Sequence, residues 1–280
     1  MPWGPSERPP ARLWIGGDVF LGASPEGRLA AIRDLERGRA GAVNLEGAIG
    51  EAAVAEGDRL IQPPSVLREL AGAGVKVALV TNNHWFDDGV EGAFRTMDAV
   101  RAAGMKPAGA EVLKLGGWKV AVTAHSLEPG WSPCDLAYDL KAWRSRADAL
   151  VATFHVTGPP LYRPAPELEE AVEIALEAGA TVVAAEGTHA LAKVERRGPA
   201  VIAWGLGNLA FACDCTDEED GLLLEVDLDG QGVREAAVVP IEAGLKGRPA
   251  ALAPDAPDVY ELLDLIGSSP LRPEGPRARF

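Results

Sequence analysis

The stretch from Val75 to Gly89 reads VKVALVTNNHWFDDG, and it joins an apolar run to a dense group of polar side chains. Residues 75–80 are typical of a buried β-strand. Two asparagines, a histidine and two aspartates follow at once, in a chain with four histidines in total. A surface loop could carry such residues for solubility alone, whereas a metal or catalytic site requires them.

Working outward from this stretch, short apolar runs alternate with helical patterns for most of the 280 residues. This alternation predicts an α/β fold in which parallel strands are joined by helices. The expected strands lie at 12–17, 41–46, 75–83, 118–125, 150–155 and 180–187, and the expected helices at 24–38, 65–74, 87–104, 139–150 and 165–179. Three further strands at 200–211, 221–230 and 232–242 are separated by glycine and Asp-Gly turns, which favours antiparallel pairing.

Two of these helices carry more detailed expectations. Ser24 is expected to cap the first helix, with Pro25 at its first position. In the third helix, apolar residues recur at a spacing that lines one face, at Val90, Phe94, Met97 and Val100. We expect one domain over residues 1–243, followed by a Pro-, Gly- and Arg-rich extension over residues 244–280 with one short helix.

The composition narrows the class of function. A net charge of −14 opposes binding to nucleic-acid phosphates, so no nucleic-acid partner is expected. No apolar run approaches the length of a membrane anchor, so a cytoplasmic protein is expected. The three cysteines (Cys134, Cys213 and Cys215) are odd in number, and two of them stand in a tight Cys-x-Cys, which does not make a disulfide framework, so they are expected to be reduced thiols.

Polar side chains follow where the predicted strands end. In open α/β sheets, ligands gather beyond the carboxyl ends of the strands, so these residues are expected to converge. Carboxylates suit Mn²⁺ and Mg²⁺, and imidazole suits Zn²⁺ and Fe²⁺, so a mixed set predicts one or two divalent ions of the Mn, Fe or Zn kind. The candidates are Asp18, Glu46, Asn83, His84, His155, Glu186 and His189.

Each candidate also has a plain structural explanation. Asp18 follows two glycines and suits a turn, and Glu46 suits a helix cap. Asn83 suits an Asx turn, and His155 suits a hydrogen-bonded core position. A buried Glu186 could simply be hydrogen-bonded. Because such accidents at five successive strand ends are improbable together, a shared site is the favoured interpretation.

Five motifs occur in order between residues 13 and 211: GGDVFLG (16–22), NLEGAI (44–49), TNNHWFDDG (81–89), EGTHALAKVE (186–195) and AWGLGNLAF (203–211). In this order they resemble the motifs of the poly-γ-glutamate capsule biosynthesis (CapA) family, which is related to the calcineurin-like metallophosphoesterases. The resemblance implies a four-layer α/β/β/α sandwich with a metal centre at the sheet edges.

The resemblance also implies roles for individual residues. Asp18 and Glu46 match carboxylate ligands, with Glu46 at the bridging position, and Asn83 matches an amide ligand. His155 and His189 match metal-binding histidines. Three residues match supporting or catalytic positions: His84 the acid that protonates the leaving group, Asp87 its orienting carboxylate, and Asn208 a residue that holds the neighbouring loops.

Two departures from the family patterns bear on the metal. Phe20 stands where phosphoesterases have a histidine. Glu186 stands where the family has a histidine, and a glutamate ligand would make the site more suited to Mn²⁺ or Mg²⁺. His125 lies in TAHSLEPGW (123–131), outside the family motifs, and is expected either to contact substrate or to be part of the loop structure.

The function implied is that of a CapA-like, poly-γ-glutamate-related, metal-dependent hydrolase. A metal-activated water would attack either a phosphoester or a γ-glutamyl amide. The substrate would accordingly be a phosphorylated small molecule or a γ-linked glutamate polymer. A non-catalytic accessory protein that keeps the fold and binds a metal or ligand is the alternative.

Overall fold

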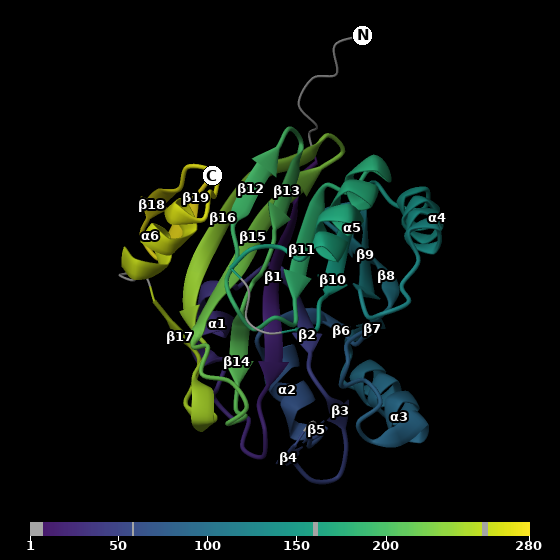
Figure 1. The fold of residues 1–280 in the computed structure, drawn as a ribbon, viewed down its shortest axis with the longest axis vertical. Helices are drawn as coiled ribbons and strands as arrows, with labels where there is room; N and C mark the ends of the chain where they lie inside the picture. Colours follow the sequence, from purple (N-terminus) through teal and green to yellow (C-terminus); the bar gives the residue numbers. More distant parts are fainter. Residues whose placement is uncertain (1–7, 58, 159–161, 254–256) are drawn as a thin grey trace.

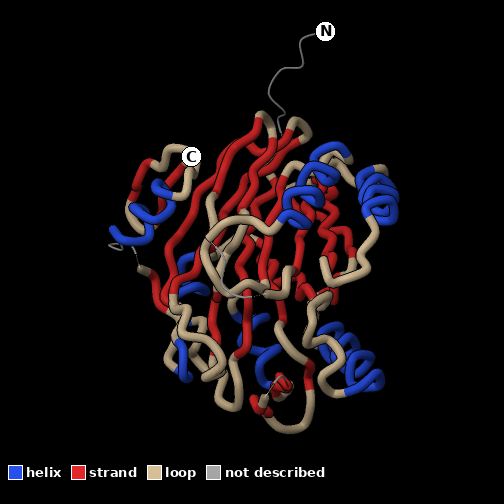
Figure 2. The backbone as a smooth tube through the Cα atoms, viewed as in Figure 1, coloured by secondary structure: helices blue, strands red, loops and turns tan. Residues whose placement is uncertain are grey.

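The structure is a computed structural model that describes residues 8–57, 59–158, 162–253 and 257–280. Two large β-sheets form the middle of the molecule, and most of the helices lie on the outside (Figures 1 and 2). The α/β class and the four-layer α/β/β/α sandwich predicted above are confirmed.

The first sheet has ten strands in the order β18-β19-β16-β15-β1-β2-β6-β7, with β14 paired to β1 and β17 paired to β16. Strands β1, β2, β6 and β7 run parallel, and β15 and β16 form a long antiparallel pair. The strands are β1 (Ala11–Phe20), β2 (Ala40–Leu45), β6 (Val75–Leu79), β7 (Lys106–Ala108), β14 (Asn208–Phe211), β15 (Asp220–Asp229), β16 (Gly232–Glu242), β17 (Ala251–Leu252), β18 (Arg272–Glu274) and β19 (Arg277–Arg279).

The second sheet has six strands in the order β12-β13-β11-β10-β9-β8. These are β8 (Ala110–Leu115), β9 (Trp118–Ser126), β10 (Ala149–His155), β11 (Val182–Glu186), β12 (Val194–Arg197) and β13 (Ala200–Ala203). A small third sheet follows β2 and consists of β3 (Ala48–Ile49), β4 (Val54–Glu56) and β5 (Arg59–Gln62).

Three apolar clusters define the layers. The first lies between the two sheets, where Leu13 and Ile15 of β1 share a cluster with Val120 and Val151. The second lies between the first sheet and α1 (Ala30–Leu35), α2 (Ser65–Gly72) and α3 (Gly89–Ala102). The third lies between the second sheet and α4 (Pro133–Arg144) and α5 (Pro166–Glu177). None of the described helices is long and apolar enough to cross a membrane.

The first helix is shorter than predicted, because α1 begins at Ala30 and its N-cap is Leu29 rather than Ser24. Gly27 has φ +78°, a left-handed conformation that a helix cannot contain. Residues 25–28 form a turn instead, in which Arg28 N–H donates to the carbonyl of Pro25.

The prediction that the apolar residues of α3 line one face is also wrong in part. Val90 and Phe94 are 57% and 64% exposed, and the buried side carries Gly92, Ala93, Thr96 and Val100. Small residues bring the helix close to β3, where Ile49 N–H donates to Thr96 Oγ1 at 2.8 Å. The side of α3 that faces β3 therefore carries small and polar residues, and Val90 and Phe94 lie outside this contact.

The residues after Gly244 contribute more than the one predicted helix, α6 (Pro257–Leu265). A 3₁₀ turn (Leu245–Gly247) and the strands β17, β18 and β19 also form there. Strands β17 and β19 pair with β16, so this segment extends the first sheet.

Candidate metal centre

Strand alternation brings the candidate ligands to one place between the sheets. In β10 and β11, Val151 and Val182 face the inter-sheet core. A period of two puts His155 and Glu186 on that same face, and the two residues are partners in the parallel register. In β2, Ala42 faces the same core, so Asn44 and Glu46 follow it on the same side.

Asp18, Glu46 and His155 form the centre of the group. Each offers one ligand atom, and these atoms lie within 4.8 Å of one another. All three residues are buried, with at most 1% of their surface exposed. Two carboxylates and an imidazole at this separation are a donor set that suits a divalent transition-metal ion.

The backbone around Asp18 explains the preceding glycine. Asp18 N–H donates to the carbonyl of Gly207 at 3.1 Å, where β1 and β14 approach each other. A Cβ atom at Gly17 would lie 1.9 Å from the same carbonyl oxygen. Gly17 is therefore required by this close approach, and Asp18 lies within the strand rather than in a turn.

Asn44 lies in the middle of the cluster, a position that the sequence reasoning missed. Its Nδ2 donates to Asp18 Oδ1 at 2.8 Å and to Glu46 Oε2, and lies 3.4 Å from His155 Nδ1. Asn44 thus contacts all three members of the central group. The available signal was its place two residues before Glu46, which puts both side chains on one face of the strand.

His189 reaches the cluster from the loop after β11. Its Nδ1 lies 3.1 Å from Asp18 Oδ2 and 2.9 Å from Asn208 Oδ1. Its backbone has φ +60°, a conformation that is uncommon outside glycine and is found often at functional sites. Asn208 also donates to the carbonyl of Glu218, so it links the His189 loop to the segment before β15.

The two asparagines before His84 have different surroundings. Asn83 Oδ1 accepts from His155 Nε2 at 2.8 Å, so both side chains lie at the cluster. Asn82 is buried and donates to Asn44 Oδ1 and to the carbonyl of Leu45, both at 2.9 Å. Asn82 therefore fixes the loop and leaves Asn83 as the candidate ligand.

His84 and Asp87 form a pair at the edge of the cluster. His84 Nδ1 lies 2.8 Å from Asp87 Oδ2, and Leu60 N–H donates to the same oxygen at 2.5 Å. The other ring nitrogen of His84, Nε2, is 3.9 Å from Glu46 Oε1. The Nε2 atom therefore points toward the cluster.

The pKa values of the buried residues in the cluster depend on one another. Burial opposes the ionisation of Asp18, but its hydrogen bond and ion pair with His189 outweigh burial and lower its pKa. Burial lowers the pKa of His155 to about 4, despite the opposing charge of Asp18. For His189, the hydrogen bond and charge of Asp18 and the charge of Glu46 outweigh burial and raise the pKa to about 9.

For Glu46 and Glu186, burial and repulsion outweigh the contacts that favour ionisation. Burial, followed by repulsion from Asp18, raises the pKa of Glu46 well above its ordinary value. Burial and repulsion from Asp18 and Glu46 do the same to the pKa of Glu186. Glu186 Oε2 is buried and has no hydrogen-bond partner among the described residues. Three buried carboxylates with an unpartnered oxygen fit a divalent cation, which would balance their charge.

His125 lies apart from the cluster. Its ring contacts Phe154, which faces the helices α4 and α5, and its Nε2 is 3.8 Å from Asp139 of α4. Because Phe154 and His155 point to opposite faces of β10, His125 is on the far side of the sheet from the cluster. This placement favours the structural alternative over substrate contact.

A cavity of about 440 Å³ lies beside His189. Its lining includes carboxylates and, among the described residues, no lysine or arginine: Gly158, His189, Asp214, Cys215, Thr216, Asp217 and Glu218. Cys213 and Cys215 form a disulfide at its rim, so the prediction of reduced thiols is wrong for this pair. With one residue between them, their Cα atoms are 5.2 Å apart, within reach of a disulfide bond.

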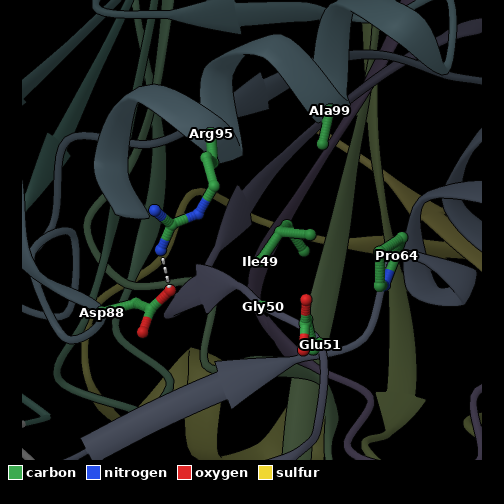
Figure 3. Close-up of a pocket in the computed structure, with 7 residues that line it drawn as sticks. All are labelled: Ile49, Gly50, Glu51, Pro64, Asp88, Arg95 and Ala99. Atoms are coloured by element: carbon green, nitrogen blue, oxygen red, sulfur yellow. Dashed lines mark hydrogen bonds and ion pairs between the residues drawn. The ribbon is translucent and has the colours of Figure 1, made fainter. Parts of the chain in front are cut away.

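A larger cavity of about 620 Å³ lies between α3 and the loop after β3 (Figure 3). Arg95 and Asp88 form an ion pair of 2.6 Å at its wall. None of the predicted site residues lines it, so the cavity is separate from the candidate metal centre. Its lining residues are Ile49, Gly50, Glu51, Pro64, Asp88, Arg95 and Ala99.

Comparison with solved structures shows the same fold in two bacterial proteins. A hypothetical protein from Thermus thermophilus aligns with a TM-score of 0.59 and 16% identity, over 83% of this chain and 99% of that one. A novel phosphatase from Mycoplasma pneumoniae aligns with a TM-score of 0.56 and 16% identity, over 84% of this chain and 94% of that one. This likeness shows that the chain shares its fold with these two proteins.

Comparison with sequences gives the family. No curated protein sequence matches the chain. Residues 25–213 match the family described as bacterial capsule synthesis protein PGA_cap. The matched range contains every predicted site residue except Asp18. The resemblance found in the five motifs is thus confirmed, and the chain belongs to the PGA_cap bacterial capsule synthesis family.

Proposed function

We propose that the protein is a metal-dependent hydrolase that acts on a phosphoester at the Asp18–Glu46–His155 cluster. The observation that carries this proposal is the convergence of these three buried side chains within 4.8 Å, next to the His84–Asp87 pair. The fold that the chain shares with a phosphatase supports the reaction class.

The residues that would hold the ion are Asp18, Glu46, Asn83, His155, Glu186 and His189. Their mixed oxygen and nitrogen donors suit Mn²⁺, Fe²⁺ or Zn²⁺, as one ion or two. When bound, such an ion lowers the pKa of water and stabilises negative charge on the substrate.

The chain itself supplies the proton for the leaving group. Asp87 accepts a hydrogen bond from His84 Nδ1, which leaves Nε2 as the atom that faces the cluster. A histidine held in this way acts as a general acid toward the leaving oxygen. The Leu60 N–H bond to Asp87 keeps the carboxylate in place during this step.

The cavity beside His189 favours a small phosphoester over a γ-linked glutamate polymer. A polymer of glutamates that leaves the cluster through this cavity would run along Asp214, Asp217 and Glu218, with no lining cation to balance its charge. A small phosphoester presents one anionic group, and that group goes to the cluster. Hydrolysis of a γ-glutamyl amide stays the second candidate, because capsule synthesis is the description of the family.

The test combines metal content with turnover. The full-length protein would be purified without chelator, its metals measured by elemental mass spectrometry, and its activity measured on phosphomonoesters, phosphodiesters and a γ-glutamyl anilide. Asp18→Ala should lose metal and activity together. Arg68→Gln, an exposed change on α2, is the matched control and should keep both.

Each result has a distinct meaning. Phosphoester turnover that requires Asp18 supports the proposal. Turnover of the γ-glutamyl anilide alone would refute phosphoester hydrolysis and support amide hydrolysis, the second candidate. Protein that binds metal but hydrolyses none of these substrates favours the non-catalytic accessory protein. Protein that takes up no metal after incubation with Mn²⁺, Fe²⁺ or Zn²⁺ refutes the metal-dependent reaction.

A further inference from the structure

A third cavity, of about 360 Å³, shares the lining residue Asp214 with the cavity beside His189. Four segments that are distant in the sequence line it: the end of β1 with the turn before α1, the start of β4, the loop after β14, and the 3₁₀ turn. None of the predicted metal ligands lines it. Most of the lining residues are glycines and alanines, and the charged ones are Arg28, Lys246 and Asp214.

Arg28 is a buried cation without a carboxylate partner. Only 9% of its surface is exposed. Its Nε donates to the backbone carbonyl of Ser24 at 2.7 Å, and its guanidinium group forms no ion pair with any of the described residues. Burial lowers the pKa of Arg28, and no neighbouring carboxylate opposes this effect. A buried charge of this kind is costly unless an anion pairs with it.

The guanidinium group of Arg28 is held between two backbone segments. The hydrogen bond from Nε to Ser24 fixes one side. On the other side lies Gly247, where a Cβ atom would be 2.6 Å from Nη2 of Arg28. Because Nε is already bonded, the fork of Nη1 and Nη2 is the part of the group that is left for a ligand. This fork matches the spacing of the two oxygens of a carboxylate.

Lys246 adds a second cation at the rim of the cavity. Its backbone has φ +56°, and His189 is the other non-glycine residue with a positive φ in the described part of the chain. Lys246 Nζ lies 4.0 Å from Asp214 Oδ1, so the charges of these two residues offset each other and that of Arg28 remains. One net positive charge matches a carboxylate, which carries one negative charge, better than a phosphate group, which carries nearly two.

We propose that this cavity binds the carboxylate group of a small molecule, with its two oxygens on Nη1 and Nη2 of Arg28 and its apolar part against the lining alanines. These are Ala23, Ala53, Ala55 and Ala212. The proposal is independent of the hydrolase activity, since none of the predicted metal ligands is part of this site.

The test measures the binding of butyrate to the full-length protein by ligand-detected NMR titration. Butyrate has one carboxylate and a small apolar part, butyramide has the same shape without the charge, and inorganic phosphate represents the other class of oxyanion. Arg28→Gln is the main variant, and Lys246→Gln, at a side chain that is 66% exposed, is the second. Arg68→Gln, at an exposed position on α2, is the matched control. Butyrate that binds at the metal centre is common to all variants, so differences between them report on this cavity.

Arg28→Gln should weaken butyrate binding about tenfold or more, because a hydrogen bond to a charged group is lost. Lys246→Gln should weaken it about twofold, since solvent screens an exposed charge. Arg68→Gln should bind butyrate as the unchanged protein does, and butyramide should bind the unchanged protein at least about tenfold more weakly than butyrate.

Equal affinity for butyrate in Arg28→Gln and in the unchanged protein would overturn the proposal. Equal affinity of the unchanged protein for butyrate and butyramide would overturn it too. Phosphate that binds more tightly than butyrate, and loses this advantage in Arg28→Gln, would overturn the choice of a carboxylate. Circular dichroism checks that Arg28→Gln is folded, and if it is not, Lys246→Gln and the comparison with butyramide decide the matter.

Discussion

The imidazole of His84 is held by the carboxylate of Asp87, with Nδ1 and Oδ2 2.8 Å apart. The two residues are three positions apart in the loop after β6, and the bond turns Nε2 toward Glu46. Neither the strand nor the loop alone sets this orientation, because Leu60 N–H from β5 fixes the Asp87 oxygen from the other side. The pair is therefore positioned by tertiary contact.

His84→Ala should lower kcat by about 10²-fold to 10⁴-fold and leave the metal content unchanged, because a general acid contributes about that much. The loss should be large for phosphoesters with an alkyl alcohol as leaving group. It should be small for p-nitrophenyl esters, whose leaving group needs no proton. Steady-state kinetics on the two substrate types check this, and an equal loss on both would exclude the role of general acid.

Asp87→Asn should lower kcat by about tenfold on the alkyl esters, because the ring keeps its place but loses the charge beside Nδ1. Asparagine still accepts the Leu60 N–H bond, so the fold should be kept. Steady-state kinetics should show the loss in kcat, with KM unchanged. A change in KM alone would assign Asp87 a structural role.

Glu186→Gln should weaken metal binding about tenfold, which removes about 1.4 kcal/mol of metal-induced stabilisation. Without metal, the same change should raise Tm, because it removes one of three buried carboxylates in mutual repulsion. Thermal unfolding with and without Mn²⁺ measures both effects. Glu111→Gln on β8 is the control, and an equal Mn²⁺ response in Glu186→Gln and the control would show that Glu186 is no ligand.

Gly187→Ala should destabilise the protein and disturb His155. The backbone there has φ +97°, and a Cβ atom would lie 2.5 Å from His155 Cε1. Strain of this kind costs about 1–3 kcal/mol. In addition, the clash would push the His155 ring away from Asn83. Gly267→Ala is the matched control, because Gly267 has φ +85° with no atom near the Cβ position.

Urea unfolding and metal content of the two glycine variants separate strain from clash. Gly267→Ala should lose stability and keep its metal, whereas Gly187→Ala should lose both. Metal content that is equal in the two variants would mean that His155 tolerates the extra methyl group.

The sequence predicted the place of the candidate site because the ends of the strands can be recognised in it. A polar residue after an apolar run marks the edge of a sheet, and Asp18, Glu46, His155 and Glu186 were found in this way. Family motifs then assigned the expected roles. The contribution of Asn44 was not predicted, since an asparagine inside a strand resembles any other polar residue until its neighbours on β1 and β10 are known.

The parts that were wrong depend on contacts between distant segments. The apolar residues Val90 and Phe94 indicated a buried face, but α3 faces β3 with the side that carries Thr96, which is hydrogen-bonded to Ile49. The strands β18 and β19 are three residues each and rich in arginine, which is a weak strand signal. They form because β16 offers an edge with which to pair.

Glu36 provides a final prediction, outside both proposed sites. Its side chain is buried, and neither carboxylate oxygen has a hydrogen-bond partner among the described residues. Burial, with the nearby Glu225, raises the pKa of Glu36 to about 8, although the charges of Arg39 and Arg277 oppose the shift. Arg39 Nε is 3.8 Å from Glu36 Oε2, too far for a hydrogen bond.

Glu36→Gln should make the protein less sensitive to alkaline pH. Between the ordinary pKa of 4.5 and about 8, the folded state keeps a proton on Glu36 that the unfolded state releases. The free energy of unfolding therefore falls as pH rises, by up to about 1.4 kcal/mol per pH unit for this group. Glutamine removes that slope, so the variant should match the unchanged protein near pH 4.5 and exceed it at pH 8. Urea unfolding from pH 5 to 9 measures the difference, with the exposed Glu91→Gln as control. Parallel curves for Glu36→Gln and the unchanged protein would mean that Glu36 is already ionised in the fold at neutral pH.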